Sequence, residues 1–332
     1  MRGYLLRLSK LLSSSLTTCN LASREPVVPR SSRWTLIRLW PRFDSLFSSM
    51  SRPNPQVDFK MLLRACAWLA FLAALADSIV AGGSEPTVPH EIVSLFNGKD
   101  LTGLTTWLKD THQSDPRKVF KVQDGIIQVS GEGNGYVATE KEYRDYRLVV
   151  EYKWGQRTDG GKYVRNSGVL LHAVGPDGGA GGAWPSCIEC QLAQGCVGDL
   201  IVIRGKDSQA AIIPVQITAE TELAPDGRRH RWSPGGEVKT FPPTRGQLWW
   251  SKHDWDFKEL LDTRGKDDIE NPLREWNRVE VLCEGDRLAI SVNGLKVNEC
   301  RNVFPTAGRI LLQTEGFEIF FRKFELHPLK AL

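Results

Sequence analysis

The segment 276-WNRVEVLCEGDRLAISVNGLKVNEC-300 contains three alternating apolar runs joined by two tight turns. The runs are Trp276–Glu284, Arg287–Val292 and Leu295–Cys300, and their two-residue period is typical of half-buried β-strands. A Gly-Asp pair at 285–286 makes the first turn. An Asn-Gly pair at 293–294, the preferred type I′ hairpin turn, makes the second. The segment therefore predicts a three-stranded antiparallel meander.

The meander also predicts where its two cysteines lie. We expect Cys283, Arg287 and Cys300 to form one row across the three strands. Neighbouring strands are about 4.8 Å apart, so the two cysteines would be ~9.6 Å apart at Cα, beyond the reach of a disulfide. We therefore predict no bridge between them.

The same alternation recurs through the rest of the chain from Glu91 onward. The longest alternating run is Tyr143–Trp154, with Arg147 and Glu151 on its polar face. Other predicted strands are Val119–Val122, Ile126–Val129, Asn166–Ala173, Cys187–Leu192, Leu200–Arg204, Ala211–Val215 and a last hairpin of Gly308–Thr314 with Phe317–Leu326. A dozen or more strands with two faces to bury predict an all-β fold, a jelly-roll β-sandwich of two antiparallel sheets.

One stretch departs from this pattern. Glu220–Asn271 is rich in Pro, Gly, Arg and Trp, and we expect it to be a long excursion over one face of the sandwich. Within it, a helical turn or two is expected near Phe257–Asp262. The 30 glycines and 11 tryptophans of the 332 residues otherwise favour tight turns and strands over helices.

Composition and net charge limit the kinds of binding partner that we expect. The chain is 41% hydrophobic and 25% charged, which is ordinary for a globular protein and sufficient for a core. Its net charge is only +4, and much of the excess lies in the first 64 residues. Electrostatics therefore gives no reason to expect a nucleic-acid partner.

The N-terminal region reads as a leader. Residues 1–60 show no sustained periodicity and are expected to be a disordered extension. Residues 61–81 carry Arg64, an apolar run from Ala65 to Ala76 and then small residues, the pattern of a secretory signal peptide. Twelve apolar residues fall short of the ~20 that span a membrane, so we expect no stable anchor after cleavage. We expect a periplasmic or secreted protein, whether translation starts at Met1 or at Met61.

Cysteine spacing bears on metal and redox chemistry. Five of the seven cysteines follow the predicted signal, an odd number that leaves at least one free thiol in an oxidising compartment. Cys187 and Cys190 form a C-x-x-C, but they lie on a predicted strand, where residues three apart face opposite sides. No second C-x-x-C or paired His follows, so we predict no metal site. No cofactor is predicted, although a divalent cation is compatible with the acidic and amide side chains.

Several strings together resemble the 3-keto-disaccharide hydrolase domain family. They are LFNGKDLTG at 95–103, YVATEKE at 136–142 followed by Tyr146-Arg147-Leu148, NSGV at 166–169, ECQ at 189–191, Trp276-Asn277, Asn293-Gly294, and Gly308…Leu312-Gln313…Gly316…Phe321-Arg322. The resemblance covers residues 91–329. It implies a fold similar to concanavalin-type lectins and glucanases, and cleavage of glycosides whose sugar carries a ketone at carbon 3. His172 and Glu315 depart from the family pattern, which usually has Arg and often has His there.

The acidic residues favour an uncommon glycosidase chemistry. Laminarinase-type sandwiches supply their carboxylates from one strand in an E-x-D-x-x-E string. Here that stretch begins with Glu189 but has Gln191 and Gln194 at the later acidic positions. An amide cannot transfer a proton as a carboxylate does. A 3-keto sugar needs only one base, because the ketone acidifies the hydrogen on carbon 2 and the resulting enolate expels the group on carbon 1 before water adds.

We accordingly assign candidate roles to eight residues. Glu189 is the candidate base, and His172 is an alternative base or the proton donor. Candidate substrate-binding residues, for hydroxyl groups and for stacking on the sugar ring, are Asn166, Gln191, Gln313, Glu315, Trp184 and Trp249. Each also has a structural reading: a solvated or paired Glu189, a rim histidine, a turn asparagine, and tryptophans packed on the sandwich.

Three functions remain open from the sequence. The first is an exported hydrolase acting on 3-keto-glycosides by enolate-forming elimination and hydration. The second is a non-catalytic, lectin-like carbohydrate-binding module, and the third is a structural or adhesive sandwich. A concavity in which Glu189 and Gln191 cluster with other polar groups would favour the first.

Overall fold

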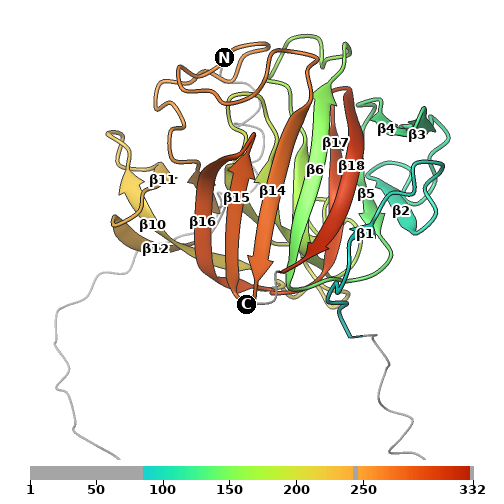
Figure 1. Ribbon diagram of the computed structural model, residues 1–332, viewed down its shortest axis with the longest axis horizontal. Helices are drawn as coiled ribbons and strands as arrows, with labels where there is room; N and C mark the ends of the chain where they lie inside the picture. Colours follow the sequence, from blue (N-terminus) through green and yellow to red (C-terminus); the bar gives the residue numbers. More distant parts are fainter. Residues whose placement is uncertain (1–84, 242–245, 330–332) are drawn as a thin grey trace, which may run out of the picture. The chain divides into compact units, whose positions relative to one another are not determined.

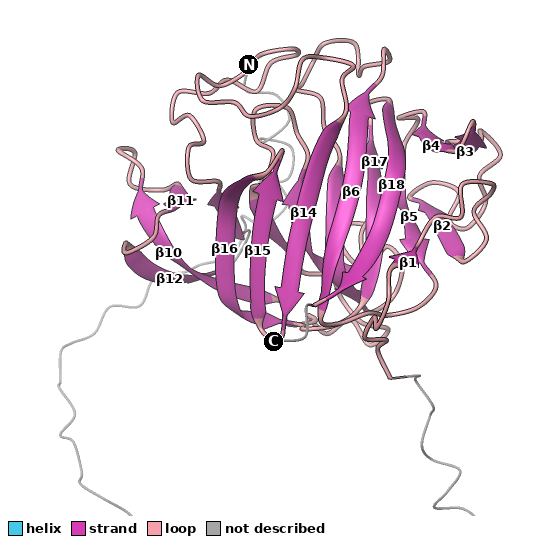
Figure 2. Ribbon diagram, in the orientation of Figure 1, coloured by secondary structure: helices cyan, strands magenta, loops and turns pink. Residues whose placement is uncertain are grey.

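The computed structural model describes residues 85–241 and 246–329. The predicted extension (1–60) and signal (61–81) lie outside these residues. The described part contains strands, turns and loops but no helix (Figure 2), so the helical turn expected near Phe257–Asp262 is wrong: that stretch forms hydrogen-bonded turns. None of the described residues forms a helix that could cross a membrane.

The strands form two sheets. The first sheet runs, from one edge to the other, through β3 (Phe120–Gln123), β4 (Ile126–Val129), β18 (Ile319–Pro328), β6 (Tyr146–Trp154), β14 (Asn277–Glu284), β15 (Arg287–Val292) and β16 (Leu295–Phe304). The short β1 (Val93–Ser94) pairs with the last part of β18, whereas β4 pairs with its first part. Strands β16, β15, β14, β6 and β18 stand side by side in the front layer of Figure 1.

The second sheet is longer. Its order is β2 (Leu104–Leu108), β5 (Asn134–Thr139), β17 (Arg309–Glu315), β7 (Gly168–Val174), β8 (Ser186–Gln191), β9 (Leu200–Ile203), β13 (Gly246–Trp249), β11 (His230–Trp232), β10 (Gln216–Leu223) and β12 (Glu237–Phe241). Every strand pairing in the two sheets is antiparallel except β11 with β13, which is parallel.

One strand joins the sheets. The first part of β16 pairs with β15, where Leu288 lies opposite Cys300. Its last residues pair with β10 of the second sheet, through Arg301 opposite Thr218 and Phe304 opposite Gln216. The chain thus closes one corner of the sandwich with continuous hydrogen bonding.

The core between the sheets follows from the alternation. On β6 the predicted inward face of Tyr146, Leu148, Val150, Tyr152 and Trp154 is buried throughout. The polar residues of that strand point outward, where Glu151 pairs with Arg278 and Arg322. The predicted sandwich is therefore confirmed, with its core assembled from the period-two faces.

Four details of the prediction were wrong. Cys283 lies opposite Leu288 rather than Arg287, because the two-residue turn pairs Glu284 with Arg287 and moves the row by one. Cys283 and Cys300 then flank Leu288, and both are free thiols. The stretch 211–215 forms only an isolated bridge, and the supposed excursion 220–271 contains the end of β10 and all of β11, β12 and β13.

The fourth error concerns the last hairpin. Strands β17 and β18 follow each other closely but do not pair: β17 joins β5 and β7 in the second sheet, and β18 joins β4 and β6 in the first. Local alternation predicts a strand but not which sheet it enters.

The buried carboxyl group of Glu270 adds a pH-dependent contribution to stability. Its Oε1 accepts hydrogen bonds from the Tyr152 hydroxyl (2.7 Å) and the Trp154 indole (3.1 Å), and its Oε2 accepts one from the Gly195 amide (3.2 Å). Burial, and to a lesser degree the nearby charge of Asp268, raises the pKa of Glu270 to about 7. Between about pH 4.5 and 7, the native state therefore keeps a proton on Glu270 that the unfolded chain has released.

We expect the free energy of unfolding to fall as pH rises from about 4.5 to about 7, because between these values the native state binds more protons. In Glu270→Gln this pH-dependent change, on the order of 3 kcal/mol between the two limits, disappears. Urea unfolding of both proteins between pH 4.5 and 8 measures it, with Glu222→Gln at an exposed site as the control. Parallel pH profiles for wild type and Glu270→Gln would contradict the assignment.

Candidate functional site

The outer face of the second sheet, away from the core, carries the predicted polar residues. On β8, Ile188 and Cys190 face the core between the sheets, whereas Cys187 faces an apolar cluster on the other side. The expectation that the two cysteines of the C-x-x-C face opposite ways is confirmed. Glu189 and Gln191 alternate with the core residues and so share the outer face with Cys187.

Strand register places the outer-face residues in rows. Glu189 lies opposite Leu170 on β7, and Gln191 lies opposite Gly168. On the other side of β7, Leu312 lies opposite Val169, which brings Gln313 beside Gly168. The row thus runs from Gln313 across Gly168 to Gln191, with carboxamides on both sides of a glycine.

The Glu189 side chain leans over that glycine. A Cβ atom placed on Gly168 would lie 2.4 Å from Glu189 Oε1. Glu189 is only 4% exposed, so its carboxylate rests against the sheet surface between the two glutamines instead of extending into solvent. The structure therefore brings together Glu189, Gln191 and Gln313.

Asn166 and Glu315 extend this group toward one end of the sheet. The Asn166 Nδ2 group donates a hydrogen bond to Glu315 Oε2 at 2.8 Å. Glu315 lies four residues beyond Leu311, which is in the row of Glu189. At about 3.3 Å per residue it is ~13 Å further along the strands, and two strands away. That figure concerns the backbones; the Glu315 carboxylate itself is bound to Asn166, two residues before the glycine over which Glu189 leans.

Three carboxamide oxygens in this region are buried and accept no hydrogen bond from the described residues. They are Asn166 Oδ1, Gln194 Oε1 and Gln313 Oε1. A buried acceptor without a donor costs about 1–3 kcal/mol, so such groups need a reason to be retained. Hydroxyl groups of a bound sugar are donors of the required kind.

An apolar cluster adjoins the polar row on the same face. Trp184 and Trp107 pack, half-buried, against buried residues that include Leu170, Cys187 and Leu311. Trp184 therefore borders the same face as Glu189, the position predicted for a ring that stacks on a sugar.

Trp249 is held differently. Its ring is stacked on His253 (centroids 3.6 Å apart) and on Trp255 (5.3 Å), with the Arg229 guanidinium 4.7 Å from its centroid. Only 9% of the residue is exposed. The ring is occupied within the protein, and we give Trp249 no role in holding a sugar.

His172 does not lie beside Glu189. Its backbone has φ = 50°, at an irregularity in the β7–β8 pairing that turns the side chain into the core. There the ring packs edge-on against Tyr146, and Nδ1 lies 2.9 Å from the Pro305 carbonyl oxygen. Burial lowers the pKa of His172 to about 4, so the ring is neutral at physiological pH. This placement separates it from the candidate base.

A buried Asp–His–Cys group was missed by the sequence reading. His253 Nδ1 lies 2.9 and 3.0 Å from the two oxygens of Asp199, and its Nε2 lies 3.8 Å from Cys196 Sγ. Asp199 also accepts hydrogen bonds from the Trp250 amide and the Gln247 side chain. The signal available was the histidine shortly after the strand at 246–249.

Cys196, Asp199 and His253 are residue types that bind metal ions, and among the described residues they place their ligand atoms close together. Their ligand atoms are already engaged with one another, since Nδ1 donates to the carboxylate and burial raises the pKa of the Cys196 thiol, which keeps its proton. We interpret the group as an internally satisfied network. It adjoins Gln191, whose backbone N–H donates a hydrogen bond to the Asp199 backbone carbonyl at 2.9 Å.

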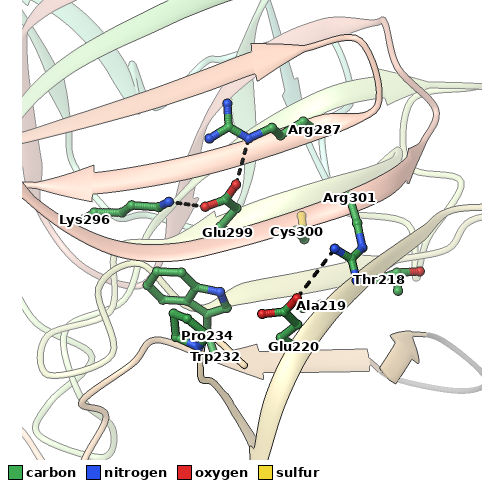
Figure 3. A pocket seen from close by; sticks show the side chains of 10 residues that line it. All are labelled: Thr218, Ala219, Glu220, Trp232, Pro234, Arg287, Lys296, Glu299, Cys300 and Arg301. Atoms are coloured by element: carbon green, nitrogen blue, oxygen red, sulfur yellow. Dashed lines mark hydrogen bonds and ion pairs between the residues drawn. The ribbon is translucent and has the colours of Figure 1, made fainter. Parts of the chain in front are cut away.

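A separate hollow of about 360 Å³ lies at the corner where β10 meets β15 and β16 (Figure 3). Its charged groups pair among themselves: Arg287 and Lys296 with Glu299, and Arg301 with Glu220. The Lys296 ammonium lies 5.2 Å from the centre of the Trp232 ring. None of the predicted site residues lines this hollow.

The fold and the polar face define an all-β sandwich with the carboxylate of Glu189 among carboxamides on the outer surface of a sheet. The chain belongs to the 3-keto-alpha-glucoside-1,2-lyase-like domain family, whose model matches residues 91–327. The resemblance seen in the sequence is confirmed. Membership supports a carbohydrate-related function.

Comparison with solved structures gives distant similarities. A candidate glycosyl hydrolase from Parabacteroides distasonis ATCC 8503 is 20% identical, covering 72% of this chain and 94% of that chain, with a TM-score of 0.43. The carbohydrate-binding module CBM66 from Bacillus subtilis is 9% identical, covering 67% and 94%, with a TM-score of 0.37. The Bacillus licheniformis β-glucanase is 9% identical, covering 71% and 97%, with a TM-score of 0.36. No curated protein matches the chain.

Proposed function

We propose that this protein cleaves glycosides whose sugar carries a ketone at carbon 3. One observation carries the proposal: the carboxylate of Glu189 rests on the sheet surface between Gln313 and Gln191, and Gln191 and Gln194 stand at the positions where laminarinase-type sandwiches carry their further acids. A site of this composition suits a reaction that needs one base.

The reaction follows from the acidity that the ketone confers. The Glu189 carboxylate takes the proton from carbon 2, and the electron pair forms an enolate with the carbon 3 oxygen. The enolate re-forms the ketone and expels the oxygen at carbon 1, which takes up a proton from solvent. Water then adds across carbons 1 and 2: the Glu189 carboxyl, whose proton has exchanged with solvent, protonates carbon 2, and carbon 1 gains the hydroxyl of water while the remaining proton of that water passes to solvent. The sum is hydrolysis, with no oxidant or reductant consumed.

The carboxamides contribute binding and orientation. The unpartnered oxygens of Asn166 and Gln313 accept hydrogen bonds from sugar hydroxyl groups, while the amide group of Asn166 remains fixed on Glu315. Such contacts hold carbon 2 against the base, and positioning of this kind supplies much of the rate of a proton transfer. The half-buried Trp184 provides an apolar surface beside them.

Replacement of Glu189 by Gln should reduce turnover of 3-keto-trehalose or a 3-keto-glucoside by about 10²–10⁴-fold, because a carboxamide cannot accept the proton. Wild type acting in D₂O should leave deuterium at carbon 2 of the product, which a direct displacement at carbon 1 would not. The parent sugars without the ketone should not react, and Glu222→Gln serves as the surface control. Equal rates for wild type and Glu189→Gln would remove Glu189 from the mechanism.

Replacement of Gln313 by Leu separates binding from folding. Because Gln313 Oε1 has no donor among the described residues, its loss should leave the melting temperature unchanged or higher. The same change should weaken substrate binding about 10-fold, through the loss of one hydrogen bond. Thermal unfolding and substrate titration measure the two effects. A large loss of stability with unchanged binding would assign Gln313 to the scaffold.

A non-catalytic carbohydrate-binding module is the second candidate, since unpartnered carboxamide oxygens and Trp184 would serve binding equally well. Such a module would bind 3-keto sugars or their parents without turnover. The comparison of wild type with Glu189→Gln therefore also decides between the two functions.

We further propose that the protein acts in the periplasm or outside the cell, on the basis of the apolar run Ala65–Ala76 and the small residues after it. The protein isolated from its own cells should begin after Ala76 or near Ala81. Mass spectrometry of the N-terminal peptide checks this, and a mature chain that still contains residues 61–76 would contradict it.

A further inference from the structure

Gly168 is glycine in a place where the backbone does not call for one. It is not among the residues with positive φ, and it lies in regular antiparallel pairing opposite Gln191. Even at the first residue of a strand, as here, glycine costs more backbone entropy than other residues and offers no side chain to pack. The reason for glycine must therefore lie in the space around it.

That space is filled by Glu189. A Cβ atom on Gly168 would lie 2.4 Å from Glu189 Oε1 and 3.0 Å from both Cδ and Cγ. These are the three nearest atoms, and all belong to one side chain. Non-bonded heavy atoms prefer about 3.5–4.0 Å, so even a methyl group at position 168 and the present position of the carboxylate exclude each other.

The surroundings make the position specific. Gln313 and Gln191 flank Gly168 on the neighbouring strands, so the glycine leaves a one-residue gap in a row of side chains. Glu189 belongs to the adjacent row, opposite Leu170, and its carboxylate reaches diagonally into that gap. Without the gap the carboxylate would stand above the carboxamides instead of between them.

We infer that Gly168 is a positioning residue for the base: it sets the height and direction of the Glu189 carboxylate relative to the groups that hold the sugar. The inference rests on the proposed function for its catalytic consequence, whereas the positioning itself is a property of the fold. Displacement of a reacting group by about 1 Å is sufficient to cost on the order of 10² in rate.

The first test is a crystal structure of Gly168→Ala. The expected result is a folded protein in which the Glu189 carboxylate has moved away from residue 168 and the two flanking glutamines remain in place. A carboxylate that stays over residue 168 would overturn the inference. This measurement does not depend on activity, so it decides the positioning even if wild type turns over no 3-keto sugar, a result that would instead overturn the proposed function.

The second test is kinetic. Gly168→Ala should lower kcat on a 3-keto-glucoside about 10²-fold with little change in KM, and should shift the acidic limb of the pH profile, which reports the base. The matched control is Val169→Ala on the same strand, whose side chain faces the core: it should lower the melting temperature but keep kcat near that of wild type.

A double-mutant cycle isolates the pathway of the effect. If Gly168 acts only through Glu189, adding Gly168→Ala to Glu189→Gln should change the residual rate less than 3-fold, since the base is already lost. A further fall close to 100-fold would show that Gly168 acts independently of Glu189. An active Gly168→Ala with wild-type kcat and pH profile would likewise overturn its catalytic consequence.

Discussion

The pairing of β7 with β8 determines which residues of both strands face outward, and the site depends on that register. Leu170 opposite Glu189 and Gly168 opposite Gln191 put a carboxylate over a glycine and a carboxamide beside it. Because side chains alternate, a slip of one residue would send Glu189 into the apolar core and bring Ile188 out. The cost of burying an unpaired carboxylate there is far larger than that of any local turn preference, so the core enforces the geometry of the outer face.

The three buried acids of the described ranges are accommodated in three ways. Asp199 is surrounded by donors: His253, the Trp250 amide and Gln247. Glu270 also accepts three hydrogen bonds, but its surroundings raise its pKa to about 7. Glu189 instead lies at the surface of a sheet among amide side chains, next to acceptors that no described residue satisfies. Beside Glu189, the buried oxygens of Asn166 and Gln313 retain hydrogen-bonding capacity that no described residue uses.

The sequence predicts the architecture well because alternation and turn chemistry are local. The meander at 276–300, the long strand at 146–154 and the outward face of Glu189 all follow from a period of two. Errors arise where a single residue breaks the period. His172 is predicted as a second base, a proton donor or a rim histidine, but a left-handed backbone at that residue turns its side chain into the core. The sequence LLHAV at 170–174 contains no glycine, proline or asparagine that would predict such a bulge.

Other features depend on contacts between distant segments. The stacking of Trp249 on His253 and Trp255 withdraws a ring that the sequence alone presents as available. The separation of β17 and β18 into different sheets, and the convergence of Cys196, Asp199 and His253, likewise require the tertiary arrangement. Gly168 can be recognised in the sequence as part of the NSGV string at 166–169. Its contact with the Glu189 side chain can be seen only in the structure.

The pairing of β16 with both sheets affects how the domain unfolds. Since it is hydrogen-bonded to β15 in one layer and to β10 in the other, neither layer can melt without removing a neighbour of the other. A sandwich with a shared strand therefore behaves as one cooperative unit, with a single all-or-none transition rather than two. The polar face then exists only while the whole domain is intact.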